Sequence, residues 1–129
     1  MIIYFCSTLK NLKDIYKYEE PYNIVILTGS IRLFDICFDM SFKMIEEILE
    51  KAGYGKNSVN YPKTILKTAY ETGMTEDEEL LLSALNSRNN TEWFCSETAA
   101  LGIIRLTKEK YYNMFSELKT EIDTNWKTI

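Results

Sequence analysis

Hydrophobic residues recur at intervals of three and four along most of this chain, which is the period of an amphipathic helix. The pattern predicts five helices: Ile2–Tyr18, Ser30–Ala52, Pro62 to Gly73, a segment between Thr75 and Ser87, and Ser96 to about Trp126. We expect the apolar segment before Ser30, residues 23–29, to begin the second helix or to lead into it. The predicted fold is all-α: one domain over residues 1–129, an antiparallel bundle of four long helices plus a shorter fifth helix.

Each predicted helix has an apolar stripe that we expect to face the core. The second helix has two adjoining stripes, so it is expected to lie at the centre of the bundle. The predicted core residues are Ile2, Phe5, Leu9, Leu12 and Tyr16; Ile31, Phe34, Phe38, Ile45 and Ile48 with Leu33, Cys37, Met40 and Met44; Ile65, Leu66, Ala69 and Tyr70; Leu81, Leu82 and Leu85; and Ala100, Ile104, Tyr111, Phe115, Leu118, Ile122 and Trp126.

Several residue types mark the expected helix ends. Pro62 opens the third helix, because proline is favoured in a first turn. Gly53 and Gly73 close the second and third helices, because glycine adopts the left-handed conformation of a C-cap. Thr75 and Glu78 have the spacing of a capping box at the start of the fourth helix.

A narrow polar stripe runs along the second helix, and we interpret it as a solvated face. Asp39 and Lys43 can pair at a spacing of four, whereas Asp35 and Asp39 repel each other at the same spacing. Such a repulsion is also what a site for a cation or a partner would look like. The stripe consists of Arg32, Asp35, Asp39, Lys43, Glu46 and Glu50.

The composition restricts the chemistry that this chain can perform. The 129 residues carry a net charge of −4, which disfavours a general nucleic-acid binder. The chain contains no histidine, so it lacks the commonest general base and metal ligand. The three widely spaced cysteines indicate reduced thiols in the cytoplasm. We expect no catalytic residue, no metal, no cofactor and no membrane span.

A polar segment, Ser87 to Glu97, separates the fourth and fifth predicted helices and is expected to form a corner between them. Arg88 would end one helix, and Ser96 would cap the start of the next. The adjacent aromatics Trp93 and Phe94 are expected to pack against something, in the simplest case the end of the core.

Four segments together resemble the nucleotidyltransferase substrate-binding protein family, a branch of the HEPN superfamily. Gly29–Lys43 (GSIRLFDICFDMSFK) is similar to the family helix GxIQRFEYTFELAWK. Tyr61–Met74 resembles its segment SPRxxIxxAFxxGL, and Arg88–Trp93 falls where the family has RNLTSH. The segment from Tyr111 to Leu118 resembles the closing helix, so the resemblance covers nearly the whole chain from Leu9 onward.

The resemblance implies a helical homodimer that works beside a separate minimal nucleotidyltransferase subunit, in a two-gene system of the toxin–antitoxin type. Related HEPN toxins are metal-independent ribonucleases with an arginine and a histidine at the dimer cleft. Arg88 and Asn89 match that motif, but Trp93 occupies the histidine position, and indole cannot transfer a proton. We therefore expect a non-catalytic subunit that binds a nucleotide or another polyanion, with RNA as a possible ligand.

The candidate binding residues are Arg88, Asn89, Thr91, Trp93, Asp35 and Asp39. Arg88 could bind an anion beside a helix end, or it could cap carbonyl groups or pair with Glu92. If Arg88 is an exposed anion site, its replacement by alanine should cost about 1 kcal/mol or less. A ribonuclease toxin and a ligand-free dimerisation module remain the alternative functions.

Overall fold

The computed structural model describes residues 2–54, 62–91 and 96–126. Every regular element in these three ranges is helical, which confirms the predicted all-α class. None of the described helices is long and apolar enough to cross a membrane. The elements are α1 (Ile2–Leu12), η1 (Lys13–Lys17), α2 (Ile24–Lys51), α3 (Pro62–Glu71), α4 (Glu78–Thr91), α5 (Glu97–Leu106), η2 (Thr107–Tyr111), α6 (Tyr112–Glu121) and η3 (Ile122–Trp126).

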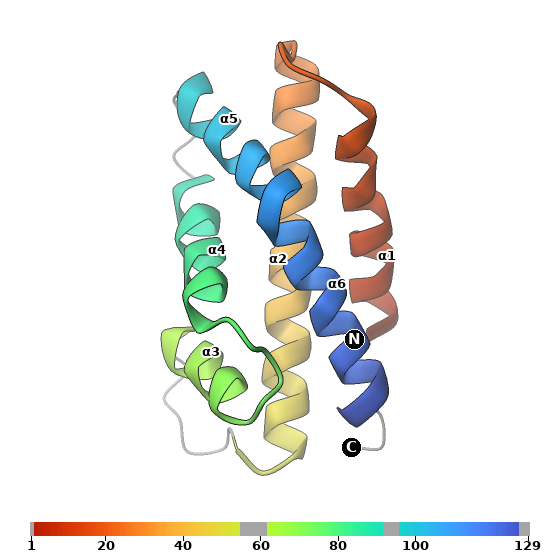
Figure 1. The fold of residues 1–129 in the computed structure, drawn as a ribbon, viewed down its shortest axis with the longest axis vertical. Helices are drawn as coiled ribbons and strands as arrows, with labels where there is room; N and C mark the ends of the chain where they lie inside the picture. The colour runs from red at the N-terminus through yellow and green to blue at the C-terminus, as the bar shows by residue number, and fades with distance from the viewer. Residues whose placement is uncertain (1, 55–61, 92–95, 127–129) are drawn as a thin grey trace.

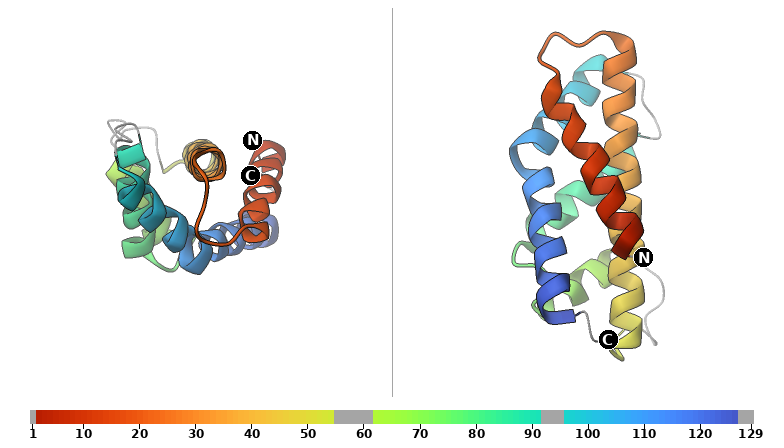
Figure 2. Two further views of the ribbon diagram at one scale, coloured as in Figure 1. Left: turned by 90° about the horizontal axis from the view of Figure 1, so that it is seen from above. Right: turned by 90° about the vertical axis from the view of Figure 1, so that its right-hand side faces the viewer.

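The helices α1, α2, α4 and the run from α5 to α6 go alternately up and down the long axis of the molecule, and the short helix α3 lies obliquely at its lower end (Figure 1). As expected, α2 is central: it packs against α1, α3, α4 and α5. Seen along the long axis, the other described helices lie on three sides of α2, and its fourth side faces away from them (Figure 2). The bundle therefore presents one long face of α2 at its surface.

The helix α2 is longer at its N-terminus than the segment with the strongest pattern. Asn23 is its N-cap, and the side chain accepts a hydrogen bond from the backbone N–H of Ile26 at 2.9 Å. The branched segment that follows Asn23 thus belongs to the helix, which confirms one of the two expectations for it. At the other end, Gly53 has a φ of +89°, the left-handed conformation predicted for a C-cap.

In α1 the predicted stripe holds for Phe5, Leu9 and Leu12, which are buried, but it is wrong for Tyr16. The chain tightens into the 3-10 segment η1 after Leu12, so the next inward residue comes three positions later and is Ile15. Ile15 is buried, whereas Tyr16 is 41% exposed and donates its hydroxyl to the carbonyl oxygen of Lys108 at 2.7 Å.

Two predictions for α3 and α4 are also wrong. Tyr70 lies at the surface, 45% exposed, whereas Ile65, Leu66 and Ala69 are the residues of α3 that face the core. The first turn of α4 is capped by Asp77, which accepts from the backbone N–H of Leu80 at 3.0 Å, and not by Thr75 with Glu78. Helix α4 begins at Glu78, so Thr75 lies too far upstream to cap it.

The C-terminal part of the chain is one continuous helical run from Glu97 to Trp126, as predicted. Ser96 caps it by accepting from the backbone N–H of Ala99 at 3.3 Å. Two segments of this run, η2 and η3, have the wider π-type hydrogen bonding. The predicted apolar stripe is buried throughout, except that Trp126 at its end is half-buried.

Candidate functional site

Helix α4 extends to Thr91 and therefore includes residues that were expected to form a polar corner. Ser87 and Thr91 are both buried, although their side chains are polar. The helix can continue because each of these hydroxyl groups finds a hydrogen-bond partner inside the bundle. Sequence polarity alone placed the helix end one turn too early.

Arg88 lies in the last turn of α4 and reaches across to α2. Its Nε donates to Oδ1 of Asp39 at 2.9 Å, and its Nη2 donates to Oδ2 of the same carboxylate at 3.0 Å. This two-pronged geometry is the strong form of an arginine–carboxylate pair. The Arg88 side chain is only 19% exposed, so the pair is partly withdrawn from water. Glu92, the partner considered from the sequence, lies outside the described residues.

Asp35 and Thr91 complete the contact on the inner side of Arg88. The Nη1 of Arg88 donates to the Thr91 hydroxyl at 3.1 Å and lies 3.7 Å from Oδ1 of Asp35. The Thr91 hydroxyl is in turn 2.7 Å from Oδ1 of Asp35 and 2.8 Å from the carbonyl oxygen of Arg88. Its single proton is donated to one of these two acceptors at a time. We call these four residues, Asp35, Asp39, Arg88 and Thr91, the arginine cluster.

The arginine cluster corrects the interpretation of Asp35 as part of a solvated stripe. Asp35 is 7% exposed and faces α4, where the partners on that helix offset the cost of its burial. Burial nevertheless raises the pKa of the Asp35 carboxyl group, while the bond from Thr91 and the charge of Arg88 oppose that rise. The repulsion between Asp35 and Asp39 is offset by the guanidinium group that contacts both.

A second polar contact, which sequence reasoning missed, joins α4 to the C-terminal run. Tyr111 is fully buried, and its hydroxyl oxygen is 2.7 Å from Oγ of Ser83 and 2.9 Å from Oγ of Ser87. Two signals in the sequence could have revealed it: the serines are four residues apart on one helix face, and a tyrosine in an apolar stripe needs a partner for its hydroxyl.

The remaining candidates lie apart from the arginine cluster or outside the described residues. Asn89 follows Arg88 on the solvent side of α4 and is exposed. Trp93 lies outside the described residues. Cys37 is fully buried, and burial raises the pKa of its thiol to about 12, so it is not a nucleophile at neutral pH.

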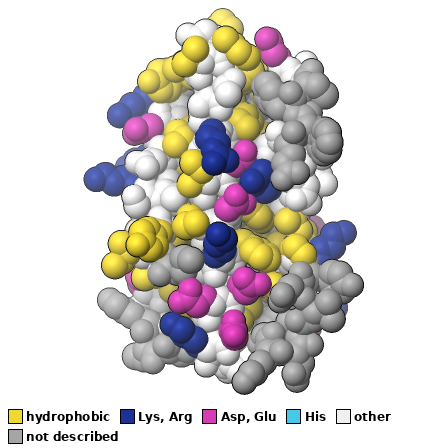
Figure 3. Space-filling view, turned by 180° about the vertical axis from the view of Figure 1, so that it is seen from behind, with side chains coloured by type: hydrophobic (Ala, Val, Ile, Leu, Met, Phe, Trp, Pro, Cys, Tyr) yellow, Lys and Arg dark blue, Asp and Glu magenta, His cyan; other side chains and the backbone are white. Residues whose placement is uncertain are grey.

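The arginine cluster satisfies its own polar groups. In the described ranges no buried side-chain nitrogen or oxygen lacks a hydrogen-bond partner. The same ranges contain no group of three or more cysteine or acidic residues placed to hold a metal ion. Viewed from behind, where α2 is in front, acidic and basic side chains alternate with hydrophobic ones down the middle of the molecule (Figure 3). The arginine cluster is thus an ion contact within the chain that joins α2 to α4.

The fold and this site define a helical bundle whose central helix carries a buried aspartate and a surface aspartate, both held by an arginine from a neighbouring helix. A model of the family described as "nucleotidyltransferase substrate binding protein like" matches residues 3–124, and the chain belongs to that family.

A solved structure from Thermus thermophilus has the same fold. It matches with a TM-score of 0.76 and 24% sequence identity, over 88% of this chain and 94% of the Thermus chain. A search of curated proteins finds no match. The comparisons therefore establish the family and the fold.

Proposed function

We propose that this chain is a non-catalytic binding subunit that pairs with a separate small nucleotidyltransferase, in a two-gene arrangement of the toxin–antitoxin type. The family to which the chain belongs is named for substrate binding beside a nucleotidyltransferase. The residues themselves support a binding role over a catalytic one, because the chain has no histidine and its buried Cys37 thiol stays protonated.

The observation that carries this proposal is the two-pronged contact between Arg88 and Asp39. Carboxylate and phosphate groups bind a guanidinium group through the same pair of N–H donors. Asp39 therefore occupies the position that a phosphate oxygen pair would take. Its side chain is 42% exposed, so it can turn toward solvent, whereas Asp35 is held inside by Thr91.

In this mechanism a nucleotide phosphate displaces Asp39 and binds Arg88 from the surface of α2 and α4. The exchange conserves the number of hydrogen bonds on the guanidinium group, and Asp35 keeps the arginine oriented. Asp39 lowers the affinity for anions, since the phosphate must compete with a carboxylate that is already in place. Only an anion that gains further contacts, such as those from a partner subunit, would bind tightly.

The test replaces Asp39 by asparagine, which removes the competing negative charge and keeps the side-chain shape. We expect Asp39→Asn to bind ATP and inorganic tripolyphosphate about tenfold more tightly than the wild-type chain does. When Arg88→Lys is added to Asp39→Asn, the gain in affinity should disappear, because lysine cannot form the fork. Titration calorimetry measures both.

A matched control exists in the same chain. Arg105 forms a similar fork with Glu20 at the surface, and Glu20→Gln removes the competing charge there. Equal gains from Glu20→Gln and Asp39→Asn would show that any arginine released on this surface attracts phosphate. No gain from Asp39→Asn, together with a folded protein, would contradict the phosphate role of Arg88 and leave the arginine cluster as a structural contact.

The same proposal includes a homodimer. The other described helices leave one long face of α2 open (Figure 2), and on that side of the molecule charged side chains lie among hydrophobic ones (Figure 3). Burial of such a mixed face between two copies is a common form of symmetric association. Light scattering should give twice the chain mass of 15.1 kDa at micromolar concentration. A mass of one chain would contradict the dimer.

Pairing with a nucleotidyltransferase is tested by co-expression of this chain with a small nucleotidyltransferase from the same genome. A complex that survives gel filtration supports the proposal, and separate elution of the two proteins contradicts it. A chain that dimerises but binds neither the enzyme nor a nucleotide would be a ligand-free dimerisation module.

We also expect the purified chain to cleave no RNA. Arg88 is engaged by two carboxylates, and no histidine is present to transfer a proton. Incubation with a labelled single-stranded RNA checks this. Cleavage that disappears in Arg88→Ala would instead support the ribonuclease function.

A further inference from the structure

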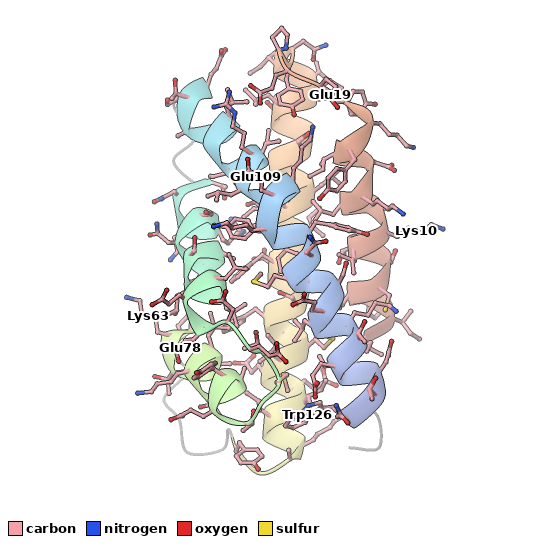
Figure 4. The ribbon with its side chains drawn as sticks, in the orientation of Figure 1. Lys10, Glu19, Lys63, Glu78, Glu109 and Trp126 are labelled. Atoms are coloured by element: carbon pink, nitrogen blue, oxygen red, sulfur yellow. The ribbon has the colours of Figure 1, made fainter. Side chains whose placement is uncertain are left out.

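A long groove runs between α4 and the C-terminal helical run, and its volume is about 840 Å³. One wall begins at the connection between α3 and α4 and continues along α4 to Ser83. The other wall extends from Leu106 to Asn125, which at 1.5 Å per residue is a length of about 30 Å. Trp126 lies just beyond its lower end (Figure 4).

The floor of the groove is apolar. Buried or half-buried side chains from both walls and from the connection line it: Met74, Leu80, Leu106, Met114 and Leu118. Leu80 and Leu106 are the half-buried members of this set, so they present most of the apolar surface at the bottom of the groove. The π-type segment η2 supplies part of the wall, and such interruptions of an α-helix are frequent at functional sites.

The rim of the groove is strongly acidic. Five carboxylates line it against one ammonium group: Glu76, Asp77, Glu79, Glu117 and Glu121 against Lys110. Among the described residues, Glu76, Glu79 and Glu117 take part in no ion pair. The excess of four negative charges here equals the net charge of the whole chain, so negative charge is concentrated on this groove.

The shape and the charge exclude several occupants. A nucleotide or another polyanion would be repelled by the rim. The carboxylates do not gather into a group that could hold a metal ion in the described ranges. They are spread along both walls, which suits an elongated cation better than a single ion. A helical groove also offers no strand edge, because its backbone groups bond within each helix.

We propose that this groove is the docking site for a basic amphipathic helix of a partner protein. Apolar side chains on one face of that helix would fill the floor, and lysine or arginine side chains beside them would meet the acidic rim. The longer wall, about 30 Å from Leu106 to Asn125, matches roughly five helical turns, and the opposite wall from Gly73 to Ser83 is shorter. The groove lies on the α4–α6 side of the bundle and the arginine cluster on the α2–α4 side, so this proposal does not depend on the phosphate role of Arg88.

The experiment uses the full chain and two synthetic helical peptides of equal length, one of leucine and lysine and one of leucine and glutamate. Fluorescence anisotropy measures affinity, and NMR shift mapping locates the bound peptide. The groove variant is Glu76→Lys with Glu117→Lys. The control variant, Glu50→Lys with Glu109→Lys, changes the charge equally at exposed positions outside the groove. The neutral pair Glu76→Gln with Glu117→Gln replaces the groove variant if that variant unfolds.

We expect the lysine peptide to bind with one-to-one stoichiometry, with shifts confined to groove residues, and the glutamate peptide not to bind. The groove variant should bind the lysine peptide about tenfold more weakly, and the control variant should bind it as the wild type does. Three results would overturn the proposal. The first is equal binding by the two variants. The second is spermine binding as tightly as the peptide, which would indicate a small-polycation site. The third is self-association of the chain that the groove variant abolishes, which would make a second copy the occupant.

Discussion

Two arginines of this chain form the same fork with a carboxylate, but in different surroundings. Arg88 holds Asp39 between two helices and is 19% exposed, whereas Arg105 holds Glu20 at the surface and is 56% exposed. We therefore expect the two forks to contribute unequally to stability. Water screens the exposed pair, whereas removal of one partner from the buried pair leaves an uncompensated charge inside the protein. The comparison predicts that burial, more than the fork geometry, decides how much each pair stabilises the fold.

The surroundings also differ in what each pair connects. Arg88 joins α2 to α4 and contacts Asp35 as a second carboxylate. Arg105 of α5 holds the connection between η1 and α2, and Lys108 of η2 donates to the carbonyl oxygen of Tyr18 in the same connection at 2.6 Å. The first contact links two core helices, while the second fixes a surface segment that has other attachments.

The largest expected effect comes from Arg88→Ala. Removal of the guanidinium group leaves Asp35 buried without its positive partner, so the free energy of unfolding should fall by about 3 kcal/mol. Urea denaturation measures it. This expectation replaces the smaller loss of about 1 kcal/mol that an exposed arginine would give. A loss no greater than that of Arg105→Ala would contradict the role assigned to burial.

The hydrogen bonds between Tyr111 and two serines join neutral groups, so they can be compared with the charged contact of Arg88. Tyr111→Phe removes the hydroxyl group that bonds to Ser83 and Ser87 and leaves both serines without it. We expect a loss of about 1–2 kcal/mol in urea denaturation, below that of Arg88→Ala, because no buried charge is uncovered. The double replacement of both serines by alanine in the Tyr111→Phe background is the control, and it should recover part of the loss.

The pH dependence of stability tests the burial of Asp35 directly. Its pKa is raised in the folded state, so the folded chain holds a proton more readily than the unfolded chain. This contribution to stability is fully present below the ordinary pKa of 3.8 and is lost as the pH rises through the folded-state value. Asp35→Asn should remove this fall in stability. Urea denaturation of the wild type and of Asp35→Asn at a series of acid pH values measures the difference between their free energies of unfolding. If the difference between the wild type and Asp35→Asn does not change with pH, Asp35 is solvated in the folded chain.

The smallest effect is expected for Arg105→Ala. The pair with Glu20 is exposed, so its removal should change the urea midpoint little, and added salt should reduce even that change. Glu20→Gln serves as the matched variant on the other side of the pair. A salt-independent loss as large as that of Arg88→Ala would erase the distinction between the two forks.

The sequence by itself determined the helices and most of the core. Periodicity located α2 and the long C-terminal run, and local chemistry located the caps at Ser96 and Gly53, because these features depend only on neighbours along the chain. Where local geometry changed, the pattern failed: the 3-10 turn of η1 moved the inward position from Tyr16 to Ile15.

Only the tertiary structure decided the partners of the polar residues. Arg88 and Asp39 are 49 positions apart, and Thr91 and Asp35 are 56 positions apart, so no local pattern could pair them. The sequence named all four as candidates but placed Asp35 in solvent, because the cost of burying a carboxylate depends on groups that the fold brings from elsewhere. The acidic groove could not be predicted from the sequence for the same reason. Its carboxylates come from two helices and a connection that meet only in the packed bundle.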